Sequence, residues 1–409
     1  MKKLIKNVVT LDMTSATPES VEGLTIANAV NIFVTTSTRP LLGKINFGNI
    51  VNVTEIADGA TFSLINGNSI FDGNINASLG EKKVYTYING SGFVNNNITA
   101  DTFACLFSAG GKVNGNITLP NTLASMLPIL NVNVNGSTTV YPADTLLYKQ
   151  DITINDGFMS GLDENSKITV FGTVYVSHDT NTELFNKYIS ELTIFGNAVI
   201  YQKQKEAFYR AARKYSEVSV VPDDYNYLDT PLLVGSANIY TLKGKSLYTR
   251  NNVYFKDEID KNLINNIDFR LITEGAVIVS ETIAEIIFDR IKTNSFNTYK
   301  GKLVIVGDAM LLIKPKSIQS YIIRKDAELT IPEDISSDDI QEYIGNIFLY
   351  GTIYLRESQM EAIMEKIVIN EGGIEIIDDT PQEEEINTDQ NNETEEYDII
   401  IGNAVNYVL

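Results

Sequence analysis

A short apolar segment with a glycine near its centre recurs along the whole chain, and this repeat limits the fold more than any other feature. The copies include LTIANAVNIFV at 24–34, INFGNIVNV at 45–53, VNGNITL at 113–119 and LTIFGNAVIY at 192–201. Apolar and polar residues alternate on both sides of the central residue, which is the pattern of a β-strand. A glycine that recurs inside such a pattern indicates a bend at which neighbouring backbones approach closely.

The central residues of these copies, here called pivot residues, are regularly spaced. They are Ala27, Gly48, Gly73, Asn96, Gly115, Gly136, Gly172, Gly196, Gly235, Gly275, Gly307, Gly351 and Gly402. The first intervals are 21, 25, 23, 19 and 21 residues, which is the length of one coil of a solenoid. We therefore predict one continuous β-solenoid, a fold that grows along a single axis without adding separate cores.

Asparagine often follows the pivot residue. It does so at Asn28, Asn49, Asn74, Asn97, Asn116, Asn197 and Asn403, with Ser137, Thr173 and Ser236 as related polar residues. Identical side chains on adjacent rungs, about 4.8 Å apart, can hydrogen-bond as a ladder along the stack. The pattern favours such a ladder over the alternative that asparagine is simply abundant in this chain.

The segments between the repeats change character along the chain. Up to residue 145 they are polar, which is typical of a parallel β-helix, whereas from about 166 they become amphipathic helices. In one of these helices Met360, Ile363, Met364 and Ile367 fall on one face. The later half thus resembles the architecture of a leucine-rich-repeat solenoid, although the LxxLxLxxN consensus is absent. The predicted divisions are a lead-in at 1–20, all-β coils at 21–145, a connecting segment at 146–165, β/α coils at 166–377, an acidic linker at 378–398 and a terminal strand at 399–409.

The charge of the chain is strongly negative and unevenly distributed. The formal net charge is −20, and the segment 378–398 holds ten acidic residues and no basic one. An acidic protein lacks the positive surface that nucleic acids and anionic membranes require, so neither is an expected partner. No apolar run is long enough for a membrane span, and the first residues do not have the pattern of a signal peptide. We expect synthesis in the cytoplasm, with incorporation into a particle, spore or filament left open.

A complete copy of the repeat lies at the C-terminus and is the most informative functional feature. It comprises Ile399, Ile400, Ile401, Gly402, Asn403, Ala404, Val405, Asn406, Tyr407, Val408 and Leu409. The strand could cap its own last coil, pair with a neighbouring chain, or return to the N-terminal edge formed by Leu24, Ile26, Asn28, Val30 and Ile32. About thirteen rungs would make a stack of roughly 60 Å, whereas a flexible 21-residue linker averages about 25 Å. The first two destinations are therefore favoured.

The sequence offers little that indicates catalysis. His178 is the only histidine and is expected in an exposed turn after a strand; Cys105 is the only cysteine and is expected to be buried. Asp72, Asp101 and Glu274 lie near strands, but nothing pairs them as a glycosidase would require. We expect no cofactor, no metal site and no enzymatic activity.

One basic patch stands out against the acidic background. It contains Lys203, Lys205, Arg210, Arg213 and Lys214, on or beside a predicted helix at 204–215. The patch is either a solvated helix face or the receptor for the acidic segment 378–398 of the same or a neighbouring chain.

The most consistent hypothesis is a structural or scaffolding subunit that assembles with itself, or with another assembly protein, through solenoid ends and the C-terminal strand. Two alternatives remain. The chain could be a binding module for a glycan or protein, since its tyrosines could stack on sugars. It could also be a carbohydrate-active β-helix enzyme.

Overall fold

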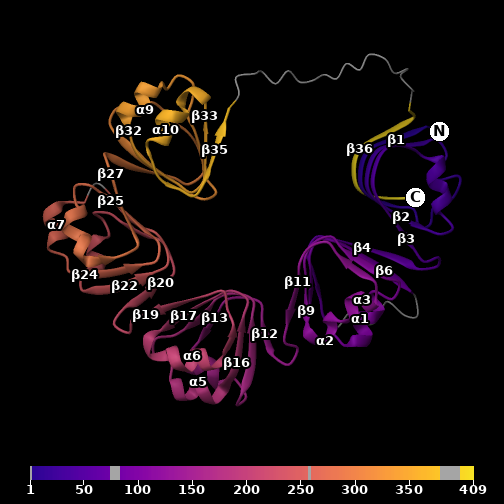
Figure 1. Ribbon diagram of the computed structural model, residues 1–409, viewed down its shortest axis with the longest axis horizontal. Helices are drawn as coiled ribbons and strands as arrows, with labels where there is room; N and C mark the ends of the chain where they lie inside the picture. Colours follow the sequence, from indigo (N-terminus) through magenta and orange to yellow (C-terminus); the bar gives the residue numbers. More distant parts are fainter. Residues whose placement is uncertain (1, 74–82, 257–258, 378–396) are drawn as a thin grey trace.

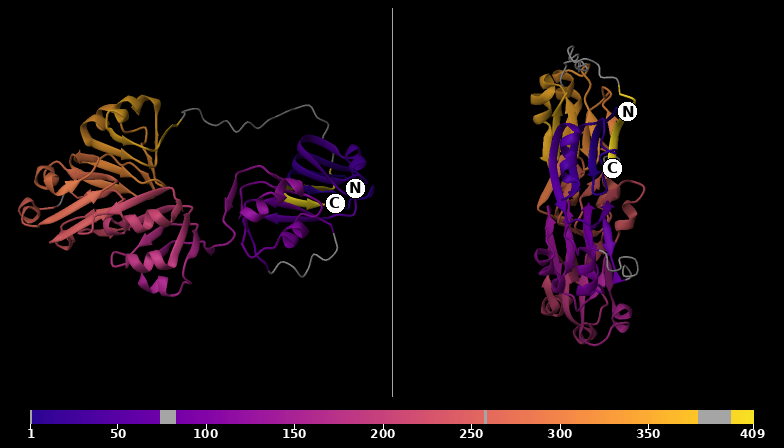
Figure 2. Two further views of the ribbon diagram at one scale, coloured as in Figure 1. Left: turned by 60° about the horizontal axis from the view of Figure 1, so that its bottom comes forward. Right: turned by 90° about the vertical axis from the view of Figure 1, so that its right-hand side faces the viewer.

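The computed structural model describes residues 2–73, 83–256, 259–377 and 397–409, and it consists of parallel β-sheets with short helices. Nine four-stranded sheets group into five units that follow one another around an arc (Figure 1). All pairs among these strands are parallel and, apart from β36 with β1, join successive coils, as the solenoid prediction requires. Figure 2 shows the same units from two further directions.

Unit 1 is built from both ends of the chain. Its sheet has the order β3-β2-β1-β36, and each rung is one long strand. The strands are β1 (Lys3–Asp12), β2 (Leu24–Thr35), β3 (Asn46–Ile56) and β36 (Ile399–Val408), with the 3-10 helix η1 (Arg39–Lys44) between β2 and β3.

Units 2 and 3 each contain two sheets of four short strands. In unit 2 the first sheet contains β4 (Thr61–Asn66), β6 (Val84–Asn89), β8 (Gly111–Val113) and β10 (Val132–Val134). The second sheet contains β5 (Ser69–Phe71), β7 (Gly92–Val94), β9 (Ile117–Pro120) and β11 (Thr138–Tyr141). The helices are α1 (Ala100–Leu106), α2 (Asn121–Ala124) and α3 (Met126–Ile129). Unit 3 consists of β12 (Leu146–Tyr148), β14 (Ser166–Val170), β16 (Ile189–Ile194) and β18 (Ala212–Lys214); β13 (Ile152–Ile154), β15 (Val174–Val176), β17 (Asn197–Tyr201) and β19 (Glu217–Val221); and α4 (Asp156–Ser160), α5 (Thr182–Tyr188), η3 (Gln202–Gln204) and α6 (Lys205–Ala211).

Units 4 and 5 have the same plan. In unit 4 the first sheet contains β20 (Asn226–Leu228), β22 (Lys245–Thr249), β24 (Phe269–Thr273) and β26 (Ile291–Lys292). The second sheet contains β21 (Leu232–Val234), β23 (Val253–Phe255), β25 (Ala276–Ser280) and β27 (Ser295–Tyr299). The helical segments are η4 (Ile239–Leu242), α7 (Lys261–Asn265), α8 (Ala284–Ile287) and η5 (Phe288–Arg290). Unit 5 consists of β28 (Lys302–Val306), β30 (Gln319–Ile323), β32 (Ile344–Leu349) and β34 (Ile367–Asn370); β29 (Ala309–Leu311), β31 (Glu328–Thr330), β33 (Thr352–Leu355) and β35 (Gly373–Ile376); and α9 (Ser337–Tyr343), η6 (Glu357–Gln359) and α10 (Met360–Met364).

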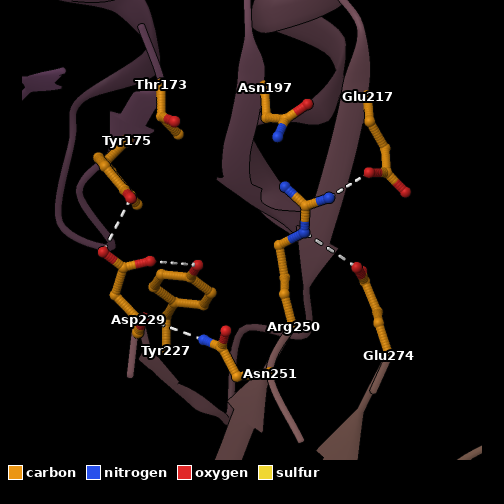
Figure 3. Close-up of a pocket in the computed structure, with 9 residues that line it drawn as sticks. All are labelled: Thr173, Tyr175, Asn197, Glu217, Tyr227, Asp229, Arg250, Asn251 and Glu274. Atoms are coloured by element: carbon orange, nitrogen blue, oxygen red, sulfur yellow. Dashed lines mark hydrogen bonds and ion pairs between the residues drawn. The ribbon is translucent and has the colours of Figure 1, made fainter. Parts of the chain in front are cut away.

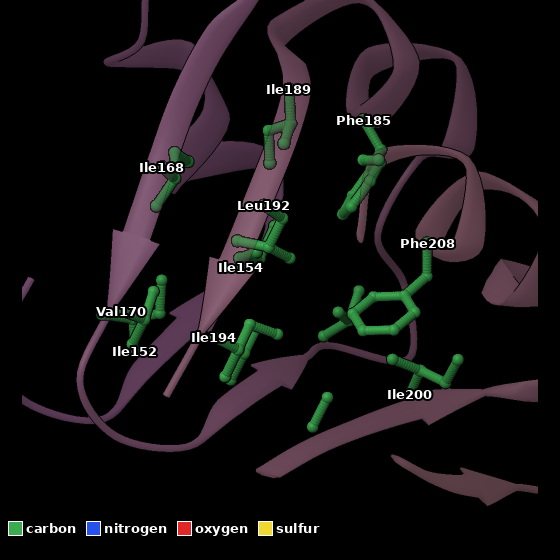
Figure 4. Close-up of a cluster of buried hydrophobic side chains, with 14 of the residues drawn as sticks. Ile152, Ile154, Ile168, Val170, Phe185, Ile189, Leu192, Ile194, Ile200 and Phe208 are labelled. Atoms are coloured by element: carbon green, nitrogen blue, oxygen red, sulfur yellow. The ribbon is translucent and has the colours of Figure 1, made fainter. Parts of the chain in front are cut away.

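Each coil of units 2–5 encloses an apolar core between its two strands and its returning segment. In unit 3, Ile168, Leu192 and Ile200 from the sheets meet Phe185 and Phe208 from α5 and α6 (Figure 4). The Asn181 side chain accepts hydrogen bonds from the first turn of α5, which fixes where that helix begins. Because a short helix is marginal alone, its burial against the strands supplies most of its stability.

Most of the pivot glycines lie where the backbones of adjacent coils approach closely, and Gly307 and Gly402 are exceptions. A Cβ atom on Gly115 would lie 2.5 Å from the carbonyl oxygen of Gly90 on the preceding coil. Backbone therefore occupies the space that any side chain would need, as the recurring glycine predicted.

Two features differ from the predicted architecture. The chain is not one thirteen-rung stack, because the sheets break after every fourth rung. At these breaks the chain turns a corner of two to four residues, such as 142–145 and 300–301, and starts a new unit. The predicted contrast at residue 146 is also not seen: α1, α2 and α3 lie in the segment expected to be all-β, and residues 146–165 contain β12, β13 and α4.

The C-terminal strand pairs with the N-terminal one, which corrects the expectation that it would cap its own last coil or pair with a neighbouring chain. β36 lies parallel to β1 with Lys3 opposite Ile399 and Asp12 opposite Val408. The distance estimate assumed a straight stack, whereas the arc of units brings unit 1 and unit 5 to the two sides of one gap (Figure 1). The predicted edge strand β2 is an interior strand, because residues 3–12 of the predicted lead-in form β1 on one side of it and β3 lies on the other.

Candidate functional site

Aromatic side chains occupy the junctions where successive units meet. Phe33 of unit 1 packs on Phe62 of unit 2, with ring centroids 4.5 Å apart. Phe93 of unit 2 meets Phe171 of unit 3 edge to face at 5.1 Å. The junction between units 4 and 5 is an apolar cluster around Tyr299, whose hydroxyl donates to the Phe255 carbonyl at 2.8 Å. These rings stabilise the arc because sheet-on-sheet packing buries their faces.

The junction between units 3 and 4 combines aromatic side chains, such as Tyr201 and Tyr248, with a polar cavity of about 490 Å³ (Figure 3). Unit 3 contributes side chains on or just before β15, β17 and β19, and unit 4 contributes side chains on β20 or directly after β20, β22 and β24. Arg250 lies centrally and forms ion pairs with Glu217 and Glu274, the latter with Nε and Oε2 3.1 Å apart. The guanidinium group therefore bridges the two units.

The opposite wall of this cavity is formed by two tyrosines and one carboxylate. The hydroxyl groups of Tyr175 and Tyr227 donate to the two oxygens of Asp229, at 2.9 and 3.0 Å. Burial, reinforced by Asp229, raises the pKa of Tyr175 to about 12. The same causes raise the pKa of Tyr227, so both phenols are protonated donors at neutral pH.

The charges of this cavity determine which ligands it suits. Three carboxylates face one guanidinium group, so the local balance is negative, which disfavours an anionic ligand. Asn197 and Asn251 add amide groups to the lining. Carboxylates, amides and phenols together can donate to and accept from the hydroxyl groups of a neutral polar ligand.

A second cavity, of about 820 Å³, lies at the junction of units 4 and 5. Its lining includes Tyr254, Tyr350, Arg324, Lys325 and Glu371. Arg324 and Lys325, both in this lining, are exposed.

The predicted asparagine ladder exists in unit 1. The amide of Asn49 donates to Asn28 at 2.9 Å, Asn28 donates to Asn7 at 2.8 Å, and Asn7 donates to Asn403 at 2.7 Å. A second ladder in unit 2 was not predicted; it consists of Asn66, Asn89, Asn114 and Asn135, each of which directly precedes a glycine.

Outside unit 1, the predicted ladder positions behave differently. Asn97 and Asn116 accept hydrogen bonds from backbone N–H groups of Gly73 and Ser137. Asn74 lies outside the described residues.

Cys105 is exposed, and the expectation that it would be buried is wrong. The buried residues of α1 are Thr102, Phe103 and Leu106, and the helical period places residue 105 on the opposite face. His178 follows β15 with a side chain 41% exposed, as expected, and its ring contacts the carboxylate of Asp179 and the carbonyl of Asp223.

The residues of the predicted basic patch lie on η3, α6 and β18 of unit 3. Arg210 pairs with Glu206 at 3.6 Å, and Arg213 with Glu191 at 3.9 Å. Lys214 lies over the ring of Phe195. The segment that the patch was predicted to bind, 378–398, lies almost entirely outside the described residues, so that hypothesis stays a prediction.

The structure separates the three carboxylates that the sequence singled out. Asp72 and Asp101 belong to unit 2, whereas Glu274 lines the cavity between units 3 and 4. Sequence reasoning missed its partners there, because Glu217, Asp229 and Arg250 come from separate coils and share no motif.

Within the described ranges, no group of three or more histidine, cysteine, aspartate or glutamate side chains could hold a metal ion. No helix among those residues is long and apolar enough to cross a membrane.

Comparisons with protein-family models, with curated proteins and with solved structures gave no match for this chain.

Proposed function

We propose that this chain is a non-enzymatic structural or scaffolding subunit of a larger assembly. The observation that carries the proposal is the concentration of exposed apolar side chains on unit 1. Val9, Val30, Ile50, Val51, Val53, Ile399, Ile400, Val405 and Val408 are all at least 37% exposed there. Exposed apolar side chains gathered on the outer face and at the edges of one sheet are typical of protein–protein interfaces.

The arrangement of the chain supports the same proposal. β36 joins the two ends of the chain in one sheet, so the five units form a frame whose first unit is completed by its last strand. A frame of this kind can present surfaces at fixed positions. The leucine-rich-repeat-like description of residues 166–377 remains an interpretation of their strand–helix–strand order.

Light scattering coupled to size exclusion, over a hundredfold range of protein concentration, tests this function. We expect the mass of the particles to increase with concentration, and negative-stain images to show defined oligomers or filaments. A chain that stays monomeric over the whole range, alone and in extracts of its source, would contradict the proposal.

A second candidate function is the binding of a neutral glycan in the cavity between units 3 and 4. The specific observation is the lining of carboxylate, amide and phenol groups around Arg250, which is suited to sugar hydroxyl groups. A panel of neutral oligosaccharides, screened by thermal shift, tests it. We expect Asp229→Asn to abolish any shift, and Asp163→Asn, an exposed residue elsewhere in unit 3, to preserve it.

A further inference from the structure

Unit 1 has two free edges with complementary properties. β3 and β36 are the outer strands of its sheet, so each presents unpaired backbone groups on one side. On β3, Ile50 and Val53 continue the core rows of Ala29 and Ile32. The latter two are 1% and 0% exposed, whereas Ile50 and Val53 are each 41% exposed. The core of unit 1 is therefore uncovered where β3 ends the stack.

The β36 edge is the other end of the same core. Ile401, Ala404 and Tyr407 pack on the core from this side and are only partly buried. They pair with Ile5, Val8 and Leu11 of β1, so the same inward rows run through all four strands. An additional rung at either end would cover side chains that belong to these rows.

The asparagine ladder gives the stack a direction. Each amide donates to the residue on the next strand, in the order Asn49, Asn28, Asn7 and Asn403. Within the described part of the chain, nothing donates to Oδ1 of Asn49, and Nδ2 of Asn403 donates to nothing. One end of the ladder thus offers an acceptor and the other end a donor, so a strand like β36 placed beside β3 would extend it.

A row of valines runs beside the ladder on the same outer face. The core residues Ala404, Val8, Ala29 and Ile50 are paired across the four strands, and a valine follows each of them. The register therefore places these valines side by side; in the same order they are Val405, Val9, Val30 and Val51. The two terminal members, Val405 and Val51, are 61% and 69% exposed, and the two interior members are 37% and 41% exposed. The ends of the row are thus the most exposed positions.

From these rows we infer that copies of this chain stack head to tail, with β3 of one copy pairing in parallel with β36 of the next. In this register Asn403 of one copy donates to Asn49 of its neighbour, and Val405 lies beside Val51. The inference rests on the proposed assembly function and specifies its interface.

A second copy fits this surface better than an unrelated partner. To continue the ladder and the valine row, a strand needs an asparagine and a valine two residues apart. To continue the core rows, it also needs an inward apolar residue between these two and one on either side of them. β36 has this pattern in Ile401, Asn403, Ala404, Val405 and Tyr407. β36 contains no charged residue, and β3 contains only Glu55, so the net charge of −20 is largely kept away from the contact. Any strand could pair through its backbone, but the side-chain rows select this one.

A charge-pair experiment tests the contact. Val51→Lys places a charge on the β3 edge, and Val405→Glu places the opposite charge on the β36 edge. We expect each single variant to raise the dissociation constant of self-association at least tenfold, measured by sedimentation equilibrium. The double variant V51K/V405E, or a mixture of the two single variants, should recover most of the affinity. Val30→Lys is the matched control, because it charges the same row on an interior strand and should change the affinity less than threefold.

A covalent test does not depend on the stability of these variants. Asn49→Cys and Asn403→Cys, combined with Cys105→Ser, should form disulfides between copies, because neighbouring strands lie about 4.8 Å apart. Within one chain the two positions are three strand spacings apart, about 14 Å, which is too far for a disulfide. We expect a ladder of covalent multimers after oxidation.

The outcomes separate the interface from the function. If the parent chain assembles, but V51K and V405E assemble equally well and no crosslink forms, the stacking inference is wrong and the scaffold proposal stands. If the parent chain does not assemble, both fail. Crosslinking together with recovery in the double variant supports both.

Discussion

In unit 1 each rung is a single strand of 10 to 12 residues, whereas in units 2–5 each rung is two short strands joined by a turn. Units 2–5 cover their faces with aromatic junctions and with short helices, and their cores contain residues such as Phe208 that are 1% exposed. Unit 1 is covered at its junction with unit 2, but its outer valine row and both of its edges face solvent. The same repeat therefore yields four units with two short strands and a helix in their coils and one unit of single long strands, and the sheets of all five units end in edge strands.

The largest expected difference between the two regions concerns their cores. Phe208→Ala in unit 3 should lower the free energy of unfolding by roughly 3–5 kcal/mol, because it leaves a cavity in a closed core. Tyr407→Ala at the open end of unit 1 should cost less, since that ring is only partly buried. Urea titration followed by circular dichroism measures both, and hydrogen exchange locates the affected unit. Equal losses would show that unit 1 is closed in solution by another chain or segment.

The pivot glycines provide a second contrast. Gly115→Ala should destabilise unit 2 by roughly 1–3 kcal/mol, because its Cβ would contact the backbone of Gly90. Gly402→Ala should change the stability by less than about 0.5 kcal/mol, since nothing lies within 4 Å of a Cβ there. Thermal unfolding of the two variants checks this order. A large loss at Gly402 would contradict the open edge that the structure gives β36.

Alkaline pH should weaken the junction between units 1 and 2. Burial raises the pKa of Tyr85 to about 12, whereas an unfolded tyrosine ionises near pH 10. The folded state therefore retains a proton that the unfolded state releases, so the stabilisation is complete below pH 10 and is lost as the pH rises toward 12. Urea midpoints at pH 9 and pH 11 measure the loss, and Tyr85→Phe should reduce it. Tyr240→Phe, at a side chain 62% exposed, is the control and should leave the loss unchanged.

The smallest expected effect concerns the two asparagine ladders. Asn28→Ala in unit 1 and Asn114→Ala in unit 2 each remove two hydrogen bonds between ladder side chains at exposed positions. We expect losses of about 0.5 kcal/mol in both cases, because exposed hydrogen bonds exchange with water. Asn49→Ala removes one bond and should cost still less. A clearly larger loss in unit 1 would indicate that its ladder continues into another molecule.

Several elements of the fold could be predicted from local sequence. The period of the pivot residues indicated coils, and the position of Asn28 and Asn49 after the pivot indicated the ladder of unit 1. Rungs without a glycine were missed, such as β12 with β13 and β18 with β19, since their apolar runs are short and carry no central signal. The helices of unit 2 were also missed, because segments of four to seven residues are too short to show a helical period.

The candidate cavity could not be predicted, apart from the isolated mention of Glu274. Arg250, Glu217 and Asp229 lie on different coils, and they meet only because units 3 and 4 pack against one another. The spacing of these residues along the chain therefore does not predict that their side chains lie close together. The exposed position of Cys105 likewise depends on the face of α1 that packs against the core of unit 2, which carries Thr102, Phe103 and Leu106.

The sequence by itself determined the repeat, the parallel stacking of its strands and the strand character of residues 399–409. These are properties of one coil and its neighbour, so local alternation and a fixed period are sufficient to specify them. Only the tertiary structure decided that the stack breaks after every fourth rung, that the units form an arc, and that β36 completes unit 1 beside β1. The physical reason is that these features depend on packing between whole sheets and on corners of a few residues, which carry no periodic signal in the sequence.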